Sequence, residues 1–231
     1  QWLLGDRDDV QAMVVPRRDP ATHRVTGNQS SYAVKYRSRI AGLDLDFLAA
    51  RHFAENLFGA GVVKSIGGAV WRLDMSYTDL RNSDNAFTAA TNMDYSWTWG
   101  GKNIYGYLEY FRNGVGERQR MNYTSPGPAL SARIARGELF TLGRDYAALG
   151  LQVEFTPLFN LHTNLINNLA DGSKFLQMRG VYDWRQNVQL MAGLNLPSGG
   201  RGTEYGGVPV VTTTAYAATG RSIYLRGAHY F

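Results

Sequence analysis

The sequence predicts an all-β protein whose antiparallel strands close into a transmembrane β-barrel. Three observations lead to this prediction: apolar and polar residues alternate through most of the chain, the alternating runs are about 10 residues long, and tight turns alternate with longer loops. Successive side chains of a strand point to opposite faces, so this alternation gives one apolar and one polar face. A helix would scatter the same residues around its whole surface.

The composition of the 231-residue chain agrees with many strands and excludes several protein classes. Glycine occurs 26 times and tyrosine 14 times, while 19% of the residues are charged, below the roughly 25% of soluble domains. Without cysteine the chain has neither disulfides nor a thiolate metal site. No apolar run is long enough for a transmembrane helix. The net charge of +5 is spread over alternate positions and not over basic runs, so we expect no nucleic-acid partner.

The firmest local prediction is a hairpin around Ala41-Gly42. Both flanking runs alternate strictly, and a two-residue turn sets their register. Apolar residues then face apolar ones and each acid faces a base, which stabilises the pairing. The predicted pairs are Ile40 with Leu43, Arg39 with Asp44, and Arg37 with Asp46.

The same alternation predicts about twelve strands in this chain. They are 8–16, 30–40, 43–53, 57–66, 69–78, 88–99, 104–113, 144–156, 159–169, 173–184, 188–197 and 221–231. Their length suits a membrane crossing, which takes about 9–11 residues in a tilted strand. An even number of strands brings both ends of the chain to the same side.

Short turns are expected on the periplasmic side and long loops on the extracellular side. The short turns are Ala41-Gly42, Gly67-Gly68, Gly100-Gly101, 156–159 and 185–187, and the longer loops are 17–29, 79–87, 114–143 and 198–220, with 53–57 and 170–173 as short exceptions. A two-residue turn at Gly67-Gly68 would place Lys64 opposite Trp71, and so on the apolar face, although lysine is charged. A bulge within 57–66 is the expected resolution.

We expect residues 1–231 to form a single barrel domain, which lacks upstream strands if the chain is the C-terminal part of a larger barrel. A soluble β-sandwich or lipocalin is the alternative, with its apolar face turned to the interior. Aromatic residues near the strand ends favour the membrane, because Trp and Tyr gather at membrane interfaces. These residues are Trp97, Trp99, Tyr182 and Trp184.

The C-terminal residues resemble a known family. Residues 223–231 are similar to the closing strand of Gram-negative outer-membrane β-barrels, which end in Phe after apolar or aromatic residues at alternate positions; Phe231, Leu225 and Ile223 match, and Gly227 and His229 match less well. Residues 143–197 resemble the C-terminal hairpins of larger porin-like proteins. The resemblance implies a location in the outer membrane among lipids and lipopolysaccharide, with Phe231 as a signal for the barrel-assembly machinery.

The polar face predicts the lining of a hydrated pore. By parity its residues are Lys35, Arg37, Arg39, Asp44, Asp46, Arg72, Asp74, Asp94, Tyr105, Tyr107, Glu109, Glu154, Arg179, Asp183 and Arg226. Both signs of charge are present, so they either create a transverse field in an open pore or neutralise one another inside a closed barrel. The two tyrosines either form a track for sugars or aromatic solutes or fill space.

Loop 114–143 is the candidate constriction. Its four arginines are Arg118, Arg120, Arg133 and Arg136, opposed by Glu117 and Glu138. If the loop folds into the mouth of the pore, its positive potential concentrates anions. The other interpretation is a solvated loop that stands outside.

The predicted function is passive diffusion of small polar solutes across the outer membrane, with a weak preference for anions. The alternative is a closed barrel that serves as a structural or partner-binding element, with another protein or with further copies of itself. An outer-membrane lipid hydrolase comes third, because His162 and Thr163 lie on opposite faces and Thr stands where such enzymes need Ser. We expect no enzymatic activity, no cofactor and no metal site.

Overall fold

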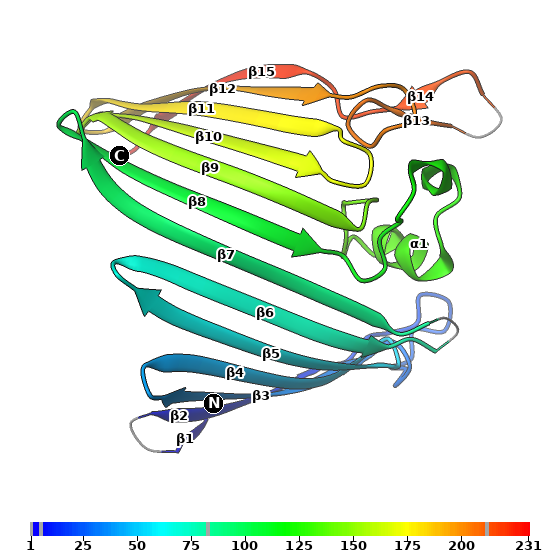
Figure 1. The fold of residues 1–231 in the computed structure, drawn as a ribbon. Helices are drawn as coiled ribbons and strands as arrows, with labels where there is room; N and C mark the ends of the chain where they lie inside the picture. Colours follow the sequence, from blue (N-terminus) through cyan, green and yellow to red (C-terminus); the bar gives the residue numbers. More distant parts are fainter. Residues whose placement is uncertain (1, 5–6, 82–83, 211–212) are drawn as a thin grey trace. The chain divides into compact units, whose positions relative to one another are not determined.

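The computed structural model describes residues 2–4, 7–81, 84–210 and 213–231, and antiparallel strands dominate it (Figure 1). Among these residues thirteen strands form one sheet in the order β1 to β12 followed by β15, while β13 and β14 form a separate hairpin. The chain divides into two compact units. Unit 1 comprises residues 1–91 and 112–115, and unit 2 comprises residues 92–111 and 116–231.

Unit 1 contains the N-terminal strands. They are β1 (Trp2–Leu3), β2 (Asp8–Val15), β3 (Ser31–Ile40), β4 (Leu43–His52), β5 (Glu55–Ile66), β6 (Ala69–Asp79) and the first part of β7 (Ala86–Trp99), which continues into unit 2. Each strand pairs with its neighbour in sequence, so this part of the sheet is a meander of hairpins.

Unit 2 contains the remaining strands and two short helices. They are β8 (Lys102–Arg112), the 3₁₀ helix η1 (Arg120–Thr124), α1 (Pro128–Ala135), β9 (Asp145–Thr156), β10 (Phe159–Asn168), β11 (Lys174–Arg185), β12 (Val188–Ser198), β13 (Val208–Pro209), β14 (Tyr216–Ala217) and β15 (Ser222–His229). Neither of these helices has the length and apolar character needed to cross a membrane.

The predicted tight turns are confirmed, and their backbone conformation explains them. The turn residues have positive φ angles: 52° and 76° at Ala41-Gly42, 55° and 87° at Gly67-Gly68, and 57° and 71° at Gly100-Gly101. Two consecutive residues with positive φ form the type I′ turn, whose twist matches that of the paired strands. At the other strand ends the loops are longer, except at Phe53-Ala54, where φ is 47° and 64°.

All twelve predicted strands are present, with bounds within two residues of the prediction. The sequence did not reveal β1, the helices η1 and α1 in loop 114–143, or the β13–β14 hairpin in loop 198–220. Residues 82–83 and 211–212 of the predicted loops 79–87 and 198–220 lie outside the described residues.

The expected bulge in β5 was wrong. Strands β5 and β6, every residue of which is described, pair without a shift from Asn56 opposite Asp79 to Ile66 opposite Ala69. Lys64 therefore lies opposite Trp71 on the same face, and it is exposed close to the Gly67-Gly68 turn. A lysine near a strand end keeps its stem on apolar surface and its ammonium group in water, so the register need not shift.

The register gives the strands of each unit an apolar and a polar face. In unit 1 the row Tyr36–Phe47–Ala60–Met75 lies on the apolar face, and the next row, Arg37–Asp46–Gly61–Asp74, lies on the polar face. In unit 2 the corresponding rows are Leu151–Thr163–Met178–Leu194–Ile223 and Gln152–His162–Arg179–Gly193–Tyr224. The predicted alternation is thereby confirmed in both units.

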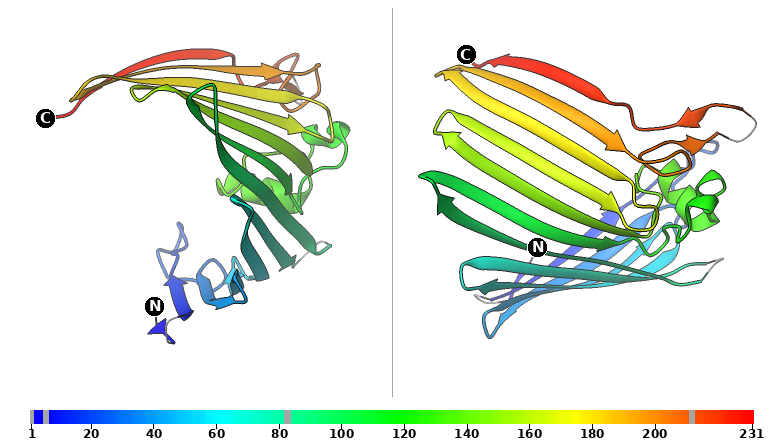
Figure 2. Two further views of the ribbon diagram at one scale, coloured as in Figure 1. Left: turned by 60° about the vertical axis from the view of Figure 1, so that its left-hand side comes forward. Right: turned by 45° about the horizontal axis from the view of Figure 1, so that its top comes forward.

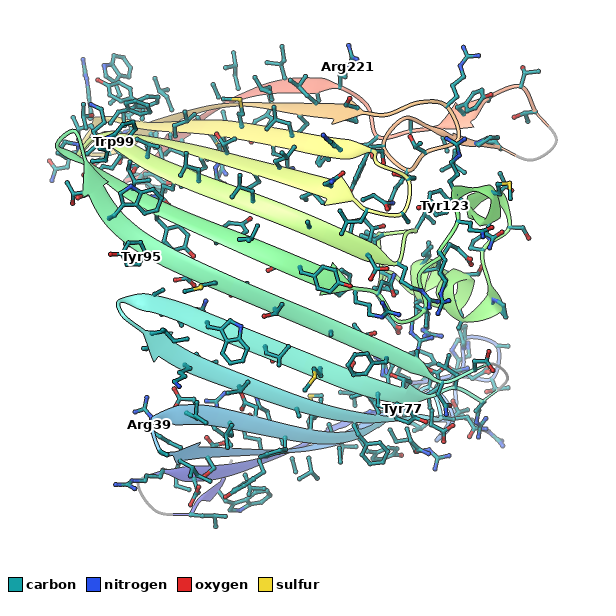
Figure 3. All side chains as sticks on the ribbon, in the orientation of Figure 1. Arg39, Tyr77, Tyr95, Trp99, Tyr123 and Arg221 are labelled. Atoms are coloured by element: carbon teal, nitrogen blue, oxygen red, sulfur yellow. The ribbon has the colours of Figure 1, made fainter. Side chains whose placement is uncertain are left out.

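Many large side chains of the apolar face are not covered by other parts of the chain. Ile223 and Leu225 are each 82% exposed, and Trp99 is 76% exposed. Figure 3 shows Trp99 at the turn end of β7 and Tyr95 farther along the same strand. Soluble monomers rarely leave so extensive an apolar surface in water.

The Ala41-Gly42 turn gives a first testable prediction. Replacing Gly42 with valine places a β-branched residue at a φ of 76°, so the free energy of unfolding should fall by about 1–2 kcal/mol. The matched control is Gly27→Val, because Gly27 has no atom near the position of an added Cβ and no left-handed backbone. Equilibrium unfolding in urea measures both, and equal losses in the two variants would contradict the turn argument.

Candidate functional site

The predicted ion pairs of the β3–β4 hairpin are present on the polar face of unit 1. The guanidinium group of Arg39 donates to both oxygens of Asp44, from Nε at 2.7 Å and from Nη2 at 3.1 Å. Arg37 Nε donates to Asp46 Oδ1 at 3.0 Å, and Lys35 Nζ reaches the same oxygen at 3.0 Å. These groups are partly exposed, so each pair adds little stability, less than about 1 kcal/mol. Their main effect is to fix where charge lies on this face.

A hollow of about 270 Å³ opens beside these ion pairs. Gly59 and Gly61 form part of its floor, and Lys35, Asp46 and Asp74 line it. A side chain at Gly61 would meet Asp74 Oδ1 at 2.6 Å from the added Cβ, so the carboxylate occupies the space that the glycine leaves. Leu48, Ala60 and Met75 also line it, so the hollow is bordered by both charged and apolar groups and is large enough to hold water.

Arg72 and Asp74 lie on the same polar face, in neighbouring rows of β6. Arg72 pairs with Val63, which lies opposite Asp44, and Asp74 pairs with Gly61. Together with the hairpin residues they place all seven predicted lining residues of unit 1 on one face. The role of these residues as a pore lining stays a prediction.

The polar face of unit 2 has a different chemical character. Of its predicted residues, Glu154 accepts a hydrogen bond from Asn103 Nδ2 at 3.1 Å, and Asp183 accepts one from Gln189 Nε2 at 2.9 Å. Tyr107 donates to Asn164 Oδ1 at 3.2 Å. Glu154 and Asp183 are thus held by neutral amides, in contrast to the salt bridges of unit 1.

The other predicted residues of unit 2 also lie at polar-face positions. Tyr105 and Glu109 share the parity of Tyr107 on β8, and the rings of Tyr105 and Tyr107 lie 6.4 Å apart between centroids. Arg179 pairs with His162 in β10 and Gly193 in β12, and Arg226 of β15 pairs with Met191. Asp94 has the polar-face parity in β7.

Neutral side chains of unit 2 form a cross-strand row that the sequence argument undervalued. Asn164, Gln177, Asn195 and Ser222 lie at successive paired positions from β10 to β15. Gln177 Nε2 donates to Asn195 Oδ1 at 3.2 Å, and Asn195 Nδ2 donates to Ser222 Oγ at 2.9 Å. The alternation along the strands was sufficient to predict this row. Most of it was left out because the predicted lining residues were chosen mainly among charged side chains.

The four loop arginines have different surroundings in the structure. Arg133 Nη1 donates to Ala129 O within α1 at 3.1 Å, and Arg136 forms a two-pronged pair with Glu138 at 2.7 and 2.8 Å. Arg118 and Arg120 are exposed. Figures 1 and 2 show η1 and α1 beyond the loop ends of β8 and β9, and not alongside these strands.

Glu117, expected to oppose the arginines, instead organises loop 114–143. Its carboxylate accepts a hydrogen bond from the backbone N–H of Gly127, which precedes α1, at 2.7 Å, and one from Asn122 Nδ2 at 3.1 Å. A carboxylate at a helix N-terminus is favoured by the helix dipole. The backbone of Glu117 also bridges to Gly143, so the two ends of the loop are joined.

A buried polar cluster joins three loops of unit 2, and we call it the loop cluster; it consists of Tyr123, Leu142, Tyr146, Asn168, Asp171 and Glu204. Glu204 accepts hydrogen bonds from the Leu142 N–H at 2.8 Å and from the Tyr146 hydroxyl at 2.5 Å. Asn168 Nδ2 donates to Glu204 at 2.7 Å and to the Tyr123 hydroxyl at 2.9 Å. Tyr123, which belongs to η1, is labelled in Figure 3.

Burial is the main influence on the Glu204 carboxyl. It raises the pKa of Glu204 because a charge is costly in a desolvated site, whereas the hydrogen bonds from Tyr146, Leu142 and Asn168 act in the opposite direction. Asp171 accepts the Glu204 N–H at 2.7 Å, and its negative charge raises the pKa further. The hydrogen bonds of the loop cluster, which join the loops, should therefore depend on pH.

A serine–histidine contact occurs in unit 1, at a place that the sequence argument did not consider. Ser31 Oγ lies 2.7 Å from His52 Nδ1 and also accepts a hydrogen bond from the guanidinium group of Arg17. Ser31 is only 7% exposed. The serine hydroxyl thus connects the preceding loop, through Arg17, to His52 at the end of β4. His162 and Thr163 occupy successive strand positions, as expected.

A comparison with protein-family models, curated proteins and solved structures finds no match for this chain.

Glu204 gives a prediction about pH. An acid whose pKa is raised on folding favours the native loops below its ordinary pKa, and this advantage is lost as pH rises through the raised pKa. Amide hydrogen-exchange protection of Leu142, corrected for the intrinsic rate at each pH, should therefore fall as the pH rises from below the ordinary glutamate pKa through the raised pKa of Glu204.

The variant Glu204→Gln removes the titration, so the protection of Leu142 should become nearly independent of pH. Glu138→Gln is the matched control in the same part of the chain and should keep the pH dependence of the wild-type protein. If Glu204→Gln keeps that dependence as well, another group is responsible.

Proposed function

We propose that this chain forms an outer-membrane β-barrel channel through which small polar solutes diffuse passively. The observation that carries the proposal is the segregation of faces along long antiparallel strands. Lipid tails cover the exposed apolar face. Closing the sheet gives every backbone N–H and C=O group in the membrane a hydrogen-bond partner. Short turns at one end of the strands and long loops at the other are a further property of outer-membrane barrels.

The polar face supports a hydrated path. In unit 1 the hollow beside Lys35 and Asp46 leaves about 270 Å³ that water can enter. A charged residue turned to lipid near the membrane centre would cost about 2–4 kcal/mol, so the ionic rows belong on the lumen side. In this proposal the residues of the polar face line the pore.

A weak preference for anions follows from the charge of the loops. The polar faces carry acids and bases in similar numbers, whereas Arg118 and Arg120 are exposed on loop 114–143. Fixed positive charge near a mouth attracts anions, and salt screens this attraction. Arg133 and Arg136 contribute less, because both are held by local partners.

A closed barrel with a structural or partner-binding role is the second candidate. The observation that favours it is the mutual neutralisation of Arg39 with Asp44 and of Arg37 and Lys35 with Asp46. Paired side chains of this kind can also fill a narrow lumen without leaving a continuous path. Conductance distinguishes the two candidates directly.

Surface labelling tests the orientation. A cysteine at Gly200, where nothing obstructs an added side chain, should react with a membrane-impermeant maleimide on intact cells. A cysteine at Gln186, in the turn between β11 and β12, should react only after the outer membrane is permeabilised. The reverse pattern would overturn the orientation.

Conductance and reversal potential test the channel. The purified protein should give discrete current steps in a planar bilayer, because a water-filled barrel conducts ions. Under a salt gradient, Arg118→Gln with Arg120→Gln should shift the reversal potential toward lower anion preference, and the shift should shrink at high salt. Arg185→Gln, at the opposite strand end, is the control and should shift it less.

A protein that inserts but gives no steps would favour the closed barrel. Current steps with an unchanged reversal potential in the double variant would support a channel. They would exclude loop 114–143 as the source of its selectivity.

A further inference from the structure

Two tyrosines of unit 2 lie across glycines on the polar face. Tyr107 of β8 covers Gly150 of β9, and Tyr224 of β15 covers Gly193 of β12; in each case the ring occupies the place where a Cβ would stand. Both glycines are buried beneath these rings. Tyr107 is half-buried and Tyr224 is 39% exposed, so part of each ring stays open to a ligand.

The two cross-strand rows between these tyrosines carry mainly neutral hydrogen-bonding groups, together with Arg179. The row Asn164–Gln177–Asn195–Ser222 begins at the hydroxyl of Tyr107, and the neighbouring row contains Gln152 and His162. Within the described part of the chain, the side chains of Gln152 and His162 have no hydrogen-bond partner. Their donors and acceptors remain available to a ligand.

The chemistry of this face fits a sugar chain. A hydroxyl group both donates and accepts, as do side-chain amides and imidazole, so the two sets of groups match. The C–H bonds on one face of a pyranose ring carry a small positive charge, and the face of an aromatic ring is negative. A surface with flat tyrosines at its ends and amides between them presents both kinds of contact.

We propose that the polar face of unit 2 binds a neutral oligosaccharide, with Tyr107 and Tyr224 as stacking platforms and the amides between them as hydrogen-bonding partners. The strands of Gly150 and Gly193 are three strand spacings apart, about 14 Å across the sheet. A short chain of sugar rings spans that distance, whereas a single ring does not.

The contrast with unit 1 favours a neutral ligand over an ion. Unit 1 presents salt bridges on its polar face, whereas Glu154 and Asp183 of unit 2 are already held by Asn103 and Gln189. A second hollow of about 250 Å³, lined by Asn103, Tyr105, Gln152 and Glu154 among others, extends the same surface toward the turn ends. Arg179 adds one guanidinium group that can donate to hydroxyls.

This inference deepens the proposed function, since it names neutral oligosaccharides as the solute class, but binding is measured without reference to conduction. The purified full chain in detergent micelles is titrated by calorimetry with maltohexaose and with cellohexaose, two neutral glucose hexamers. An oligogalacturonate of the same length, which carries a carboxylate on each ring, serves as the charged comparison. At least one neutral hexamer should bind more tightly than the acidic chain.

Variants of the two platforms locate the site. Tyr107→Leu and Tyr224→Leu should each weaken binding roughly fivefold, because each loses one stacking contact. Tyr107→Phe keeps the ring, so it should bind within about twofold of the wild-type protein. The matched control is Tyr182→Leu, whose side chain lies on the apolar face of the same unit.

Each outcome decides the inference. Loss of binding in both platform variants, with Tyr107→Phe and Tyr182→Leu near the wild-type affinity, supports it. Absence of binding to both neutral hexamers in a protein that conducts ions would overturn this inference and leave the channel intact. An affinity that does not change in the Tyr107 and Tyr224 variants, or that is higher for the acidic chain, would overturn the proposed site. Binding without conductance would keep the site and count against the channel.

Discussion

The period of two along the strands is the constraint on which the rest of this structure depends. A shift of one residue in any pairing exchanges the two faces of a strand, placing Arg37 or Arg39 among Tyr36 and Phe47. Each tight turn therefore determines the position of every side chain in its hairpin. The positive φ angles at Ala41-Gly42 are local, but their consequence is that the whole ionic row between β3 and β4 forms on a single face.

Alternation of this kind is readable from sequence, and contacts between distant loops are not. The Arg39–Asp44 and Arg37–Asp46 pairs followed from one turn and simple parity. The loop cluster joins Leu142 to Glu204 through side chains whose neighbours in sequence show no pattern. Lys64 misled the parity argument because a long side chain near a strand end tolerates either face.

The two units use one backbone plan for two kinds of surface. In unit 1 charge is paired with charge across partly exposed positions, where water screens each interaction. In unit 2 the amides of Asn164, Gln177 and Asn195 form hydrogen bonds across neighbouring strands. Glu204 is different again, since its carboxyl is buried among hydroxyl, amide and backbone donors without a basic partner among its hydrogen bonds. The polar groups of this chain therefore interact differently in each region, although the alternating pattern of the strands is the same.

The fit of Tyr107 on Gly150 and of Tyr224 on Gly193 has a consequence for how this sequence can change over time. A side chain at either glycine would meet the ring above it, so that ring must move aside or be replaced by something smaller. A change at either glycine therefore favours a change at its tyrosine. Among descendants of this chain, the two positions of each pair should vary together, even though they are 43 and 31 residues apart in sequence.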